Sequence, residues 1–417
     1  MGFPLQQVNN QNTNPWRVDF PALNNAGKPV AFMDSAASAQ KPQAVLASMD
    51  DVARSHYANI HRGLYDFSQK TTSAYEAARH TVAAFIKAQS DNEIIFTRNT
   101  TEAINLVAQC WGRSHLQAGD EILITEMEHH ANIVPWVMIA EATGAVVKYI
   151  PVLDDGRLDI TAIDSLVTDK TKLFACTHIS NAIGVVNDVH ALILKIKAAN
   201  SNVVTLIDAS QSIVHRAIDV QASGADFIVF TGHKLYGPSG IGVLWGHEDL
   251  LNTMPPYQGG GDMIETVSLK SGITYKQAPA RFEAGTPAIL ETIGLAAAID
   301  YVSAIGMDAI AAHEQTLYSY MRKRADEIDG LTFYGDVSGE EKAPILSFTA
   351  DWAHVSDIAT ILDQCGVAVR SGHHCAMPLM ERFGIDGTVR ASLGLYSTQG
   401  DVDQFINALH KAYKLLG

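Results

Sequence analysis

Seven short apolar segments, separated by stretches with helical spacing, constrain the fold of this chain more than any other feature of its sequence. The predicted strands span residues 93–97, 121–125, 146–150, 172–177, 203–208, 226–230 and 241–245. Several intervening segments carry apolar residues at the period of an α-helix, among them 101–110, 132–142 and 189–199. Strands and helices in alternation predict βαβ units and an α/β fold with a mainly parallel, seven-stranded sheet buried on both faces. Functional groups should then gather at the carboxyl ends of the strands.

The pattern changes in the last third of the chain. Two long helical runs, 288–305 and 307–329, are followed by shorter predicted strands at 345–349 and 367–370 and by a final helix at 401–416. We therefore expect three parts. They are an N-terminal segment (1–30) that is partly mobile, a large domain (31–300) that contains the sheet, and a smaller α+β C-terminal domain (301–417).

Composition and charge exclude several classes of protein. The 417 residues are 47% apolar and 18% charged, an ordinary globular mixture with enough apolar material for a buried core. A net charge of −15 argues against nucleic acid as a partner, and no apolar run approaches the roughly 20 residues of a membrane span. The chain begins without the pattern of a secretory signal, and its four cysteines have no CxxC spacing. We therefore expect a cytoplasmic protein with reduced thiols and no membrane partner.

Lys234 lies in an unusual position for a lysine. It follows an apolar strand in the string Phe-Thr-Gly-His-Lys-Leu-Tyr-Gly-Pro, so the strand end and the turn hold it close to the sheet. A desolvated lysine loses its proton readily and becomes an amine nucleophile toward carbonyl compounds. Pyridoxal phosphate (PLP) is the carbonyl cofactor that uses such an amine. Lys234 therefore predicts a PLP site if the chain supplies the other groups that this cofactor needs.

Two strand ends offer partners for the ring nitrogen and the phosphate of PLP. Asp208 ends its predicted strand, where a carboxylate either caps a helix or keeps a pyridine nitrogen protonated. Thr100 and Thr101 stand between a strand and an amphipathic helix, where a helix N-terminus binds anions, although Thr101 is also a candidate N-cap. Thr231 and His233, beside the lysine, would add donors for the phosphate.

His129 and His130 form an adjacent pair after the predicted strand 121–125. His129 is a candidate to stack on the cofactor ring. A metal site is the alternative, but the pair lacks the HExxH spacing, and adjacent side chains on an extended segment point to opposite faces. We therefore expect no metal.

Cys375 follows an arginine and two histidines in the string Arg-Ser-Gly-His-His-Cys-Ala. Cationic neighbours favour the thiolate, which is the reactive form. The alternative is a cysteine that acts as a small buried hydrophobe, which suits the apolar surroundings of the other three cysteines. Arg390 is a cation within an apolar stretch and needs an anionic partner, either an internal carboxylate or the carboxylate of a substrate.

Four strings in combination resemble a known family. They are Thr-Gly-His-Lys-Leu-Tyr-Gly-Pro around Lys234, Glu-His-His-Ala-Asn around His129, Arg-Phe-Glu-Ala-Gly-Thr-Pro at 281–287 and Arg-Ser-Gly-His-His-Cys at 370–375. From about Asp34 to its end, the chain resembles the SufS/CsdA-type, or group II, cysteine desulfurases of the class V aminotransferase superfamily. This resemblance implies PLP fold type I, conversion of L-cysteine to L-alanine with a persulfide on Cys375, and sulfur supply for iron–sulfur cluster assembly. It also implies a homodimer and a SufE- or SufU-like sulfur acceptor protein.

The resemblance implies a role for each matching residue. Lys234 would hold PLP, Cys375 would accept the sulfur, and His129 would stack on the ring and shuttle a proton. The residues implied for the rest of the cofactor are Asp208 at the ring nitrogen, Gln211 at the ring hydroxyl, Thr101, Thr231 and His233 at the phosphate, and Thr286 at the phosphate of the other subunit. The residues implied for the substrate are Asn181 and Arg390 at its carboxylate, with His61 and Arg370 nearby.

Three other functions fit parts of this pattern. A selenocysteine lyase of the same superfamily would act on L-selenocysteine, because cleavage of a carbon–selenium bond does not require an acceptor thiol. A metal-dependent hydrolase would use the histidines of two pairs, His129, His130, His373 and His374. A scaffold for cluster assembly that has lost activity is disfavoured by the intact Lys234 and Cys375.

Overall fold

The computed structural model describes residues 14–25, 27, 30–337 and 339–417. Of the N-terminal segment expected to be partly mobile (1–30), residues 1–13, 26, 28 and 29 lie outside the described residues. At its first described residue the chain contacts the C-terminal part, because Asn14 donates a hydrogen bond to the carbonyl of Leu395 at 2.6 Å. Arg17 forms an ion pair with Asp401 at 2.7 Å. Residues 14–17 are therefore tied to the far end of the sequence.

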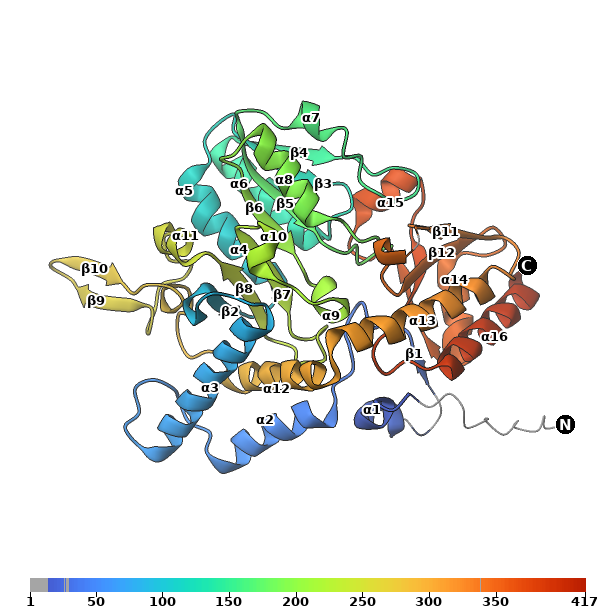
Figure 1. Ribbon diagram of the computed structural model, residues 1–417, viewed down its shortest axis with the longest axis horizontal. Helices are drawn as coiled ribbons and strands as arrows, with labels where there is room; N and C mark the ends of the chain where they lie inside the picture. Colours follow the sequence, from blue (N-terminus) through green and yellow to red (C-terminus); the bar gives the residue numbers. More distant parts are fainter. Residues whose placement is uncertain (1–13, 26, 28–29, 338) are drawn as a thin grey trace.

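A seven-stranded sheet forms the centre of the larger part of the molecule (Figure 1). Its strands lie in the order β2-β8-β7-β6-β5-β3-β4, and only β8 runs antiparallel to its neighbours. Their bounds are β2 (Ile94–Thr97), β3 (Glu121–Thr125), β4 (Val146–Ile150), β5 (Thr171–Thr177), β6 (Val204–Asp208), β7 (Phe227–Thr231) and β8 (Gly242–Gly246). The prediction of a mainly parallel seven-stranded sheet is confirmed, and each strand lies within about one residue of its predicted limits.

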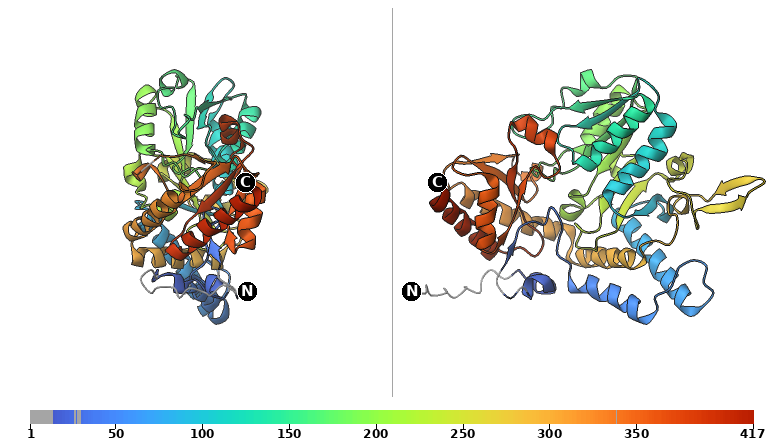
Figure 2. Two further views of the ribbon diagram at one scale, coloured as in Figure 1. Left: turned by 90° about the vertical axis from the view of Figure 1, so that its right-hand side faces the viewer. Right: turned by 180° about the vertical axis from the view of Figure 1, so that it is seen from behind.

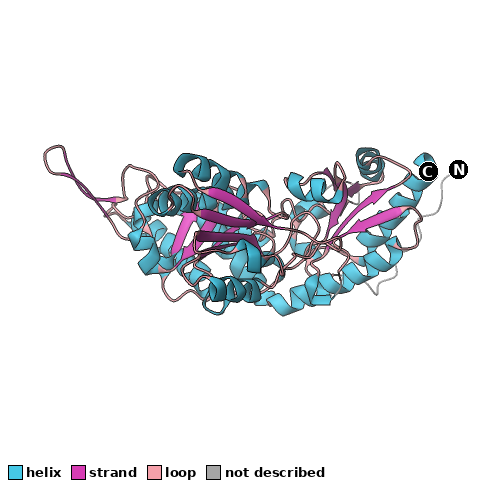
Figure 3. Ribbon diagram, turned by 90° about the horizontal axis from the view of Figure 1, so that it is seen from above, coloured by secondary structure: helices cyan, strands magenta, loops and turns pink. Residues whose placement is uncertain are grey.

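Alternate residues of this sheet enter two separate cores. In β3, Leu123 packs on one face, whereas Ile122 and Ile124 pack on the other. Helices cover both faces of the strands (Figure 3). The first face is covered by α3 (Asp66–Phe85), α8 (Val189–Ala199) and α12 (Ile289–Ile305), and the second by α4 (Thr100–Val107) and α6 (Val134–Thr143). Burial on both faces explains why these strands are continuous apolar runs rather than alternating ones.

A four-stranded antiparallel sheet forms the smaller part of the molecule (Figure 2). Its order is β11-β12-β15-β14, with bounds β11 (Leu331–Tyr334), β12 (Ile345–Ala350), β14 (Arg370–Gly372) and β15 (Thr388–Ser392). A third core joins it to the helices α13 (Met307–Ala325), α14 (Val355–Gln364) and α16 (Gln399–Leu416).

The first strand of the chain belongs spatially with this smaller sheet. β1 (Ala31–Phe32) pairs in parallel with β13 (Val367–Ala368), and Ala31 lies in the third core. In contrast, α2 (Gln43–Ser55) packs against α12 beside the large sheet. A segment that precedes the large sheet in the sequence therefore lies in the smaller part of the molecule. The predicted domain division at residue 300 stays a prediction.

Two predicted elements differ from those observed. The predicted strand 367–370 is two strands, β13 and β14, because the first pairs with β1 and the second with β15. The predicted helix 307–329 ends four residues early, at Ala325. Beyond it the chain tightens, since the amide of Ile328 bonds to the carbonyl of Ala325, and Gly330 then takes a φ of 77° that a helix does not allow.

A hairpin that the sequence patterns did not indicate projects from the larger part (Figure 1). It consists of β9 (Ile264–Ser268) and β10 (Gly272–Tyr275), with Val267, Leu269 and Ile273 exposed. Within the described ranges, no individual helix has both the length and the apolar character for a membrane span. Helices α12 and α13, which meet at a bend of 76°, are together long and apolar enough for a membrane span, but this rests on length and composition alone.

Candidate active site

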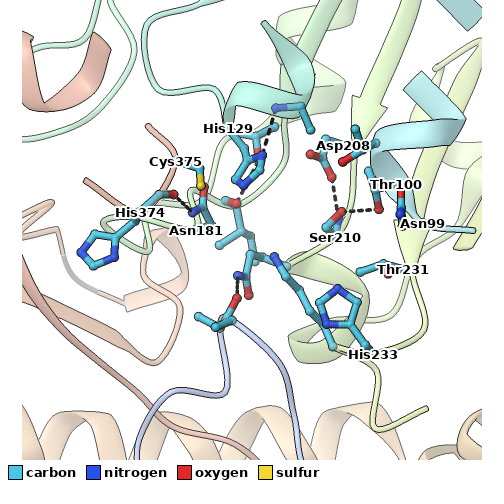
Figure 4. Close-up of a pocket in the computed structure, with 18 of the residues that line it drawn as sticks. Asn99, Thr100, His129, Asn181, Asp208, Ser210, Thr231, His233, His374 and Cys375 are labelled. Carbon is cyan, nitrogen blue, oxygen red and sulfur yellow. Dashed lines mark hydrogen bonds between the residues drawn. The ribbon is translucent and has the colours of Figure 1, made fainter. Parts of the chain in front are cut away.

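The carboxyl ends of five strands of the large sheet surround a cavity of about 240 Å³ (Figure 4). The segments at the ends of β2, β3, β5, β6 and β7 reach it from the large sheet, and the segment from β14 toward α15 (Met377–Phe383) reaches it from the smaller one. The predicted site residues that line it are Thr100, Thr101, His129, Asn181, Asp208, Gln211, Thr231, His233, Lys234, Arg370, Cys375 and Arg390. Residues from positions 100 to 390 therefore meet in one cavity.

An amine and a carboxylate lie on the large-sheet side of this cavity. Burial lowers the pKa of the Lys234 amine to about 8, with Arg390 acting in the same direction and Asp208 opposing them. Asp208 is buried, and its Oδ1 accepts a hydrogen bond from the amide of Ser210 at 2.9 Å. The alternative that Asp208 caps a helix is wrong, because the N-cap of the next helix, α9 (Ser212–His215), is Gln211.

The first turn of α4 borders the same cavity. Its N-cap is Asn99, whose side chain accepts a hydrogen bond from the amide of Glu102 at 2.9 Å, so the alternative that Thr101 is the N-cap is wrong. The hydroxyls of Thr100 and Ser210 share a hydrogen bond of 2.8 Å that ties this turn to the segment after β6. Because a helix N-terminus attracts anions, this end of the cavity can bind a phosphate.

His129 lies between the two sides of the cavity (Figure 4). Its Nδ1 accepts a hydrogen bond from the amide of Ala131 at 3.0 Å. Burial, followed by the charge of Lys234, lowers its pKa to about 4. The ring is therefore neutral at pH 7, and with Nδ1 as an acceptor its proton lies on Nε2.

Cys375 reaches the cavity on a loop with unusual backbone geometry. His374 and Cys375 both have positive φ values, 51° and 56°, which place the thiol on an exposed corner. The Cys375 carbonyl accepts a hydrogen bond from the amide of His130 at 2.7 Å, and the His374 carbonyl accepts one from Nδ2 of Asn181 at 2.8 Å. Contacts with two loops of the large sheet therefore hold the thiol at the cavity.

The four cysteines differ strongly in exposure. Cys110 and Cys176 are buried, Cys365 is half-buried and Cys375 is exposed. Burial raises the pKa of the Cys110 thiol to about 12 and that of Cys176 well above its ordinary value. The alternative that Cys375 is a buried hydrophobe is therefore wrong, whereas it fits Cys110 and Cys176.

Two arginines share one carboxylate beside the loop. Asp34 accepts a hydrogen bond from Nη2 of Arg390 at 3.0 Å and another from Nη2 of Arg370 at 3.0 Å. Arg390 also donates from Nη1 to the carbonyl of Asn181 at 2.8 Å. Its internal anionic partner is thus Asp34, yet its buried Nε has no hydrogen-bond partner among the described residues.

The histidines proposed for a metal-dependent hydrolase do not converge. His130 and His373 stack with their ring centroids 5.7 Å apart, while the ring of His374 is buried and its Nε2 lies 2.9 Å from the hydroxyl of Thr388. Within the described part of the chain, no three His, Cys, Asp or Glu side chains form a group that could hold a metal ion. The geometry gives this alternative no support.

Two predicted site residues lie outside the cavity. His61 is half-exposed and pairs with Glu76 at 2.7 Å. Thr286 borders a separate, more open hollow, which it shares with Asn99 and His233. The structure therefore does not bring His61 to the other site residues of this chain, and it places Thr286 in the neighbouring hollow.

Sequence reasoning missed Asn99, Asp34 and Glu128. An Asn-x-x-Glu pattern at 99–102 resembles a helix-capping signature and would have indicated Asn99. Glu128 is buried and accepts hydrogen bonds from Nδ2 of Asn132 at 2.6 Å and the amide of Thr177 at 2.9 Å. Burial raises the pKa of Glu128 to about 8, and its contacts fix the turn that carries His129.

Comparisons with known proteins agree with this geometry. Residues 31–405 match the family model of class V aminotransferases. A cysteine desulfurase of Pectobacterium carotovorum is 47% identical over the full length of both chains, and one of Dickeya dadantii is 49% identical over 96% of this chain and 97% of its own. The crystal structure of the cysteine desulfurase CsdA from Escherichia coli matches with a TM-score of 0.89 and 38% identity, covering 96% of this chain and 98% of that one. The chain therefore belongs to the class V aminotransferases, a PLP-dependent family, and within it to the group II cysteine desulfurases, which act on L-cysteine.

Proposed function

We propose that Lys234 holds PLP in this cysteine desulfurase and that Cys375 receives the sulfur atom of L-cysteine. One observation carries this proposal. An amine with a lowered pKa and an exposed thiol line the same cavity, together with a buried carboxylate and a neutral histidine. These are the two nucleophiles that sulfur removal from cysteine requires, in reach of one substrate.

The groups that line the cavity fit PLP. The Lys234 amine would attach to the aldehyde, and Asp208 would pair with the ring nitrogen. The first turn of α4, with Thr100 and Thr101, would bind the phosphate together with Thr231 and His233, while Gln211 would contact the ring hydroxyl. His129 would contact the ring face. When bound, PLP supplies an electron-accepting ring that makes the Cα proton of the substrate acidic.

Other side chains would bind the substrate and transfer protons. Arg390 and Asn181 would bind the substrate carboxylate, with Arg370 beside them. A neutral Lys234 amine accepts the Cα proton, and its lowered pKa makes that form accessible near neutral pH. His129, with its proton on Nε2, would exchange a proton with the substrate thiol.

Cys375 would complete the reaction. Its thiolate attacks the substrate sulfur, a sulfur–sulfur bond forms, and the carbon–sulfur bond breaks as the carbon fragment takes up protons. The products are L-alanine and a persulfide on Cys375. One sulfur atom passes from substrate to enzyme, so the step balances without an external oxidant or reductant.

Visible absorption spectra and product assays test these assignments. The protein loaded with PLP should be yellow, its spectrum should change on addition of L-cysteine, and L-alanine should form. Cys375→Ala should keep the spectrum and lose desulfuration, whereas the control Cys365→Ala should keep both. Full desulfuration by Cys375→Ala would remove this thiol from the mechanism. Assays with L-selenocysteine distinguish a lyase, because that activity would survive the loss of Cys375.

A homodimer is part of this proposal. Large apolar side chains are exposed on the projecting hairpin and near the start of α3, including Leu269, Val267, Leu64 and Tyr65. Thr286 borders a hollow lined also by Asn99 and His233, so a second subunit could bring its own phosphate-binding residues to Thr286. Sedimentation should show a dimer. Thr286→Ala should weaken PLP binding, and the variant should still sediment as a dimer.

The sulfur on Cys375 would pass to an acceptor protein for iron–sulfur cluster assembly. The exposed position of Cys375 supports transfer to a second protein thiol, as a SufE- or SufU-like acceptor would offer. Transfer of ³⁵S from L-cysteine to such a protein, in the absence of other thiols, tests this step. Retention of all the label on Cys375 with every acceptor would contradict it.

A further inference from the structure

The four-stranded sheet places two arginines directly opposite each other at the cavity. Arg370 of β14 and Arg390 of β15 are register partners, and both line the cavity. Residues opposed in this way bring their Cβ atoms to about 5 Å, and like charges at that spacing repel. The sheet therefore contains a repulsion that a negative charge must offset.

Asp34 supplies that charge from a distant part of the chain. It follows β1 and bridges in parallel to Ser392, the last residue of β15. Its Oδ1 accepts from Arg390 and its Oδ2 from Arg370, each at 3.0 Å. The Asp34 side chain is 18% exposed and that of Arg390 only 2% exposed, so solvent screens this contact weakly. The Arg370 side chain is 50% exposed, so solvent screens its contact with Asp34 more strongly. One carboxylate thus contacts both guanidinium groups.

The local charges do not cancel. Two guanidinium groups and one carboxylate leave a net charge of about +1 at this wall of the cavity. Arg390 lines the cavity, so this charge borders the space that a ligand would occupy. One uncompensated positive charge matches a ligand with a single carboxylate.

We propose that Asp34 is a positioning and specificity-determining residue that sets the charge of the substrate-carboxylate subsite. By offsetting one of the two arginines, it adapts the subsite to an amino acid with one carboxylate and disfavours ligands with a second anionic group close to the first. This inference rests on the proposed function, because it takes Arg390 to bind the substrate carboxylate.

Competitive inhibition by propionate and succinate tests the inference, since succinate is propionate with a second carboxylate. In the full-length, PLP-loaded protein, Asp34→Asn should raise the ratio of the propionate to the succinate inhibition constant about tenfold, because it frees a second positive charge. Asp34→Glu keeps the carboxylate, so its ratio of inhibition constants should equal that of the wild type. The control Asp50→Asn removes a carboxylate beside the surface residue Arg54 and should leave the ratio unchanged. An unchanged ratio in Asp34→Asn would overturn the inference.

A second set of variants keeps the test decisive if Asp34→Asn does not fold. Arg370→Gln brings the net charge of the subsite to about zero and should move the ratio in the opposite direction. The double variant Asp34→Asn/Arg370→Gln restores a net charge of about +1 and should restore the ratio. If Arg390→Gln leaves the KM for L-cysteine unchanged, the proposed carboxylate-binding role fails and this inference fails with it. If Arg390→Gln raises that KM but the ratio does not respond to Arg370→Gln, only the role of Asp34 is overturned.

Discussion

The two walls of the cavity are built in different ways. On the large-sheet wall, Asp208 ends β6 and Lys234 follows β7, and both strands lie in the interior of a seven-stranded sheet and are hydrogen-bonded on both sides. On the opposite wall, Cys375 lies on a loop whose backbone is tied to the large sheet through His130 and Asn181. The first wall is fixed by continuous strand pairing and the second by a few polar contacts. We infer that the residues that hold the cofactor keep their positions when side chains elsewhere are changed, whereas the position of the thiol depends on a few individual contacts.

The largest expected effect is on the large-sheet wall. Lys234→Ala removes the amine that attaches PLP and accepts the Cα proton, so the rate of alanine formation should fall by at least about 10³-fold, and the absorption of the attached cofactor should be absent. Absorption spectra and alanine assays measure both. As a control, Lys197→Ala removes a surface ion pair with Asp226 and should change neither. Substantial activity in Lys234→Ala would break the assignment of this wall.

A smaller effect is expected when the second wall is loosened. Asn181→Ala removes the hydrogen bond to the His374 carbonyl and leaves the loop with fewer anchors. Desulfuration should fall about tenfold to a hundredfold, since the reacting groups lose their alignment and the substrate carboxylate loses a proposed donor, while the PLP spectrum stays unchanged. The exposed Asn202 offers a control, because Asn202→Ala should leave the rate unaltered. Loss of the PLP spectrum in Asn181→Ala would show that the two walls are not separable.

The pH dependence of cofactor uptake sharpens the account of the first wall. Only the neutral Lys234 amine attacks an aldehyde, so the cofactor-free protein should take up PLP faster as the pH rises, with a midpoint near the pKa of about 8. Asp208 raises that pKa by its negative charge, so Asp208→Asn should move the midpoint to lower pH. Stopped-flow absorbance measures the midpoint. A midpoint near the ordinary value of 10.5 would mean that the amine is solvated.

The smallest effect is expected for a helix-cap variant, which tests whether the stability of the smaller part and the position of the thiol are independent. Thr398 caps α16 through reciprocal hydrogen bonds with Asp401, and neither residue lines the cavity. Thr398→Ala should lower the free energy of unfolding by about 1 kcal/mol, as the loss of an N-cap does. Denaturant titration measures this change, and the desulfuration rate should be unaltered. A parallel fall in activity would mean that general stability, rather than the loop contacts, positions Cys375.

Much of the fold was predictable because the large sheet is buried on both faces. Its strands appear as continuous apolar runs, and polar residues such as Asp208 and Lys234 stand out where each run ends. The projecting hairpin was not predictable in the same way, since Val267 and Ile273 are exposed and no buried face imposes a pattern on it. The strand at 367–370 was predicted as one element because its division depends on two different pairing partners.

The sequence by itself determined the α/β architecture, the strand ends that carry the amine and carboxylate, and the distinctive surroundings of Cys375. These features arise from local periodicity and from residue types that are rare next to buried strands. Only the tertiary structure decided that Asp34 would face Arg370 and Arg390, which lie 336 and 356 positions away, and that Asn181 would hold the carbonyl of His374. No local pattern encodes such contacts, because they exist only after segments from separate stretches of the chain have come together in the folded protein.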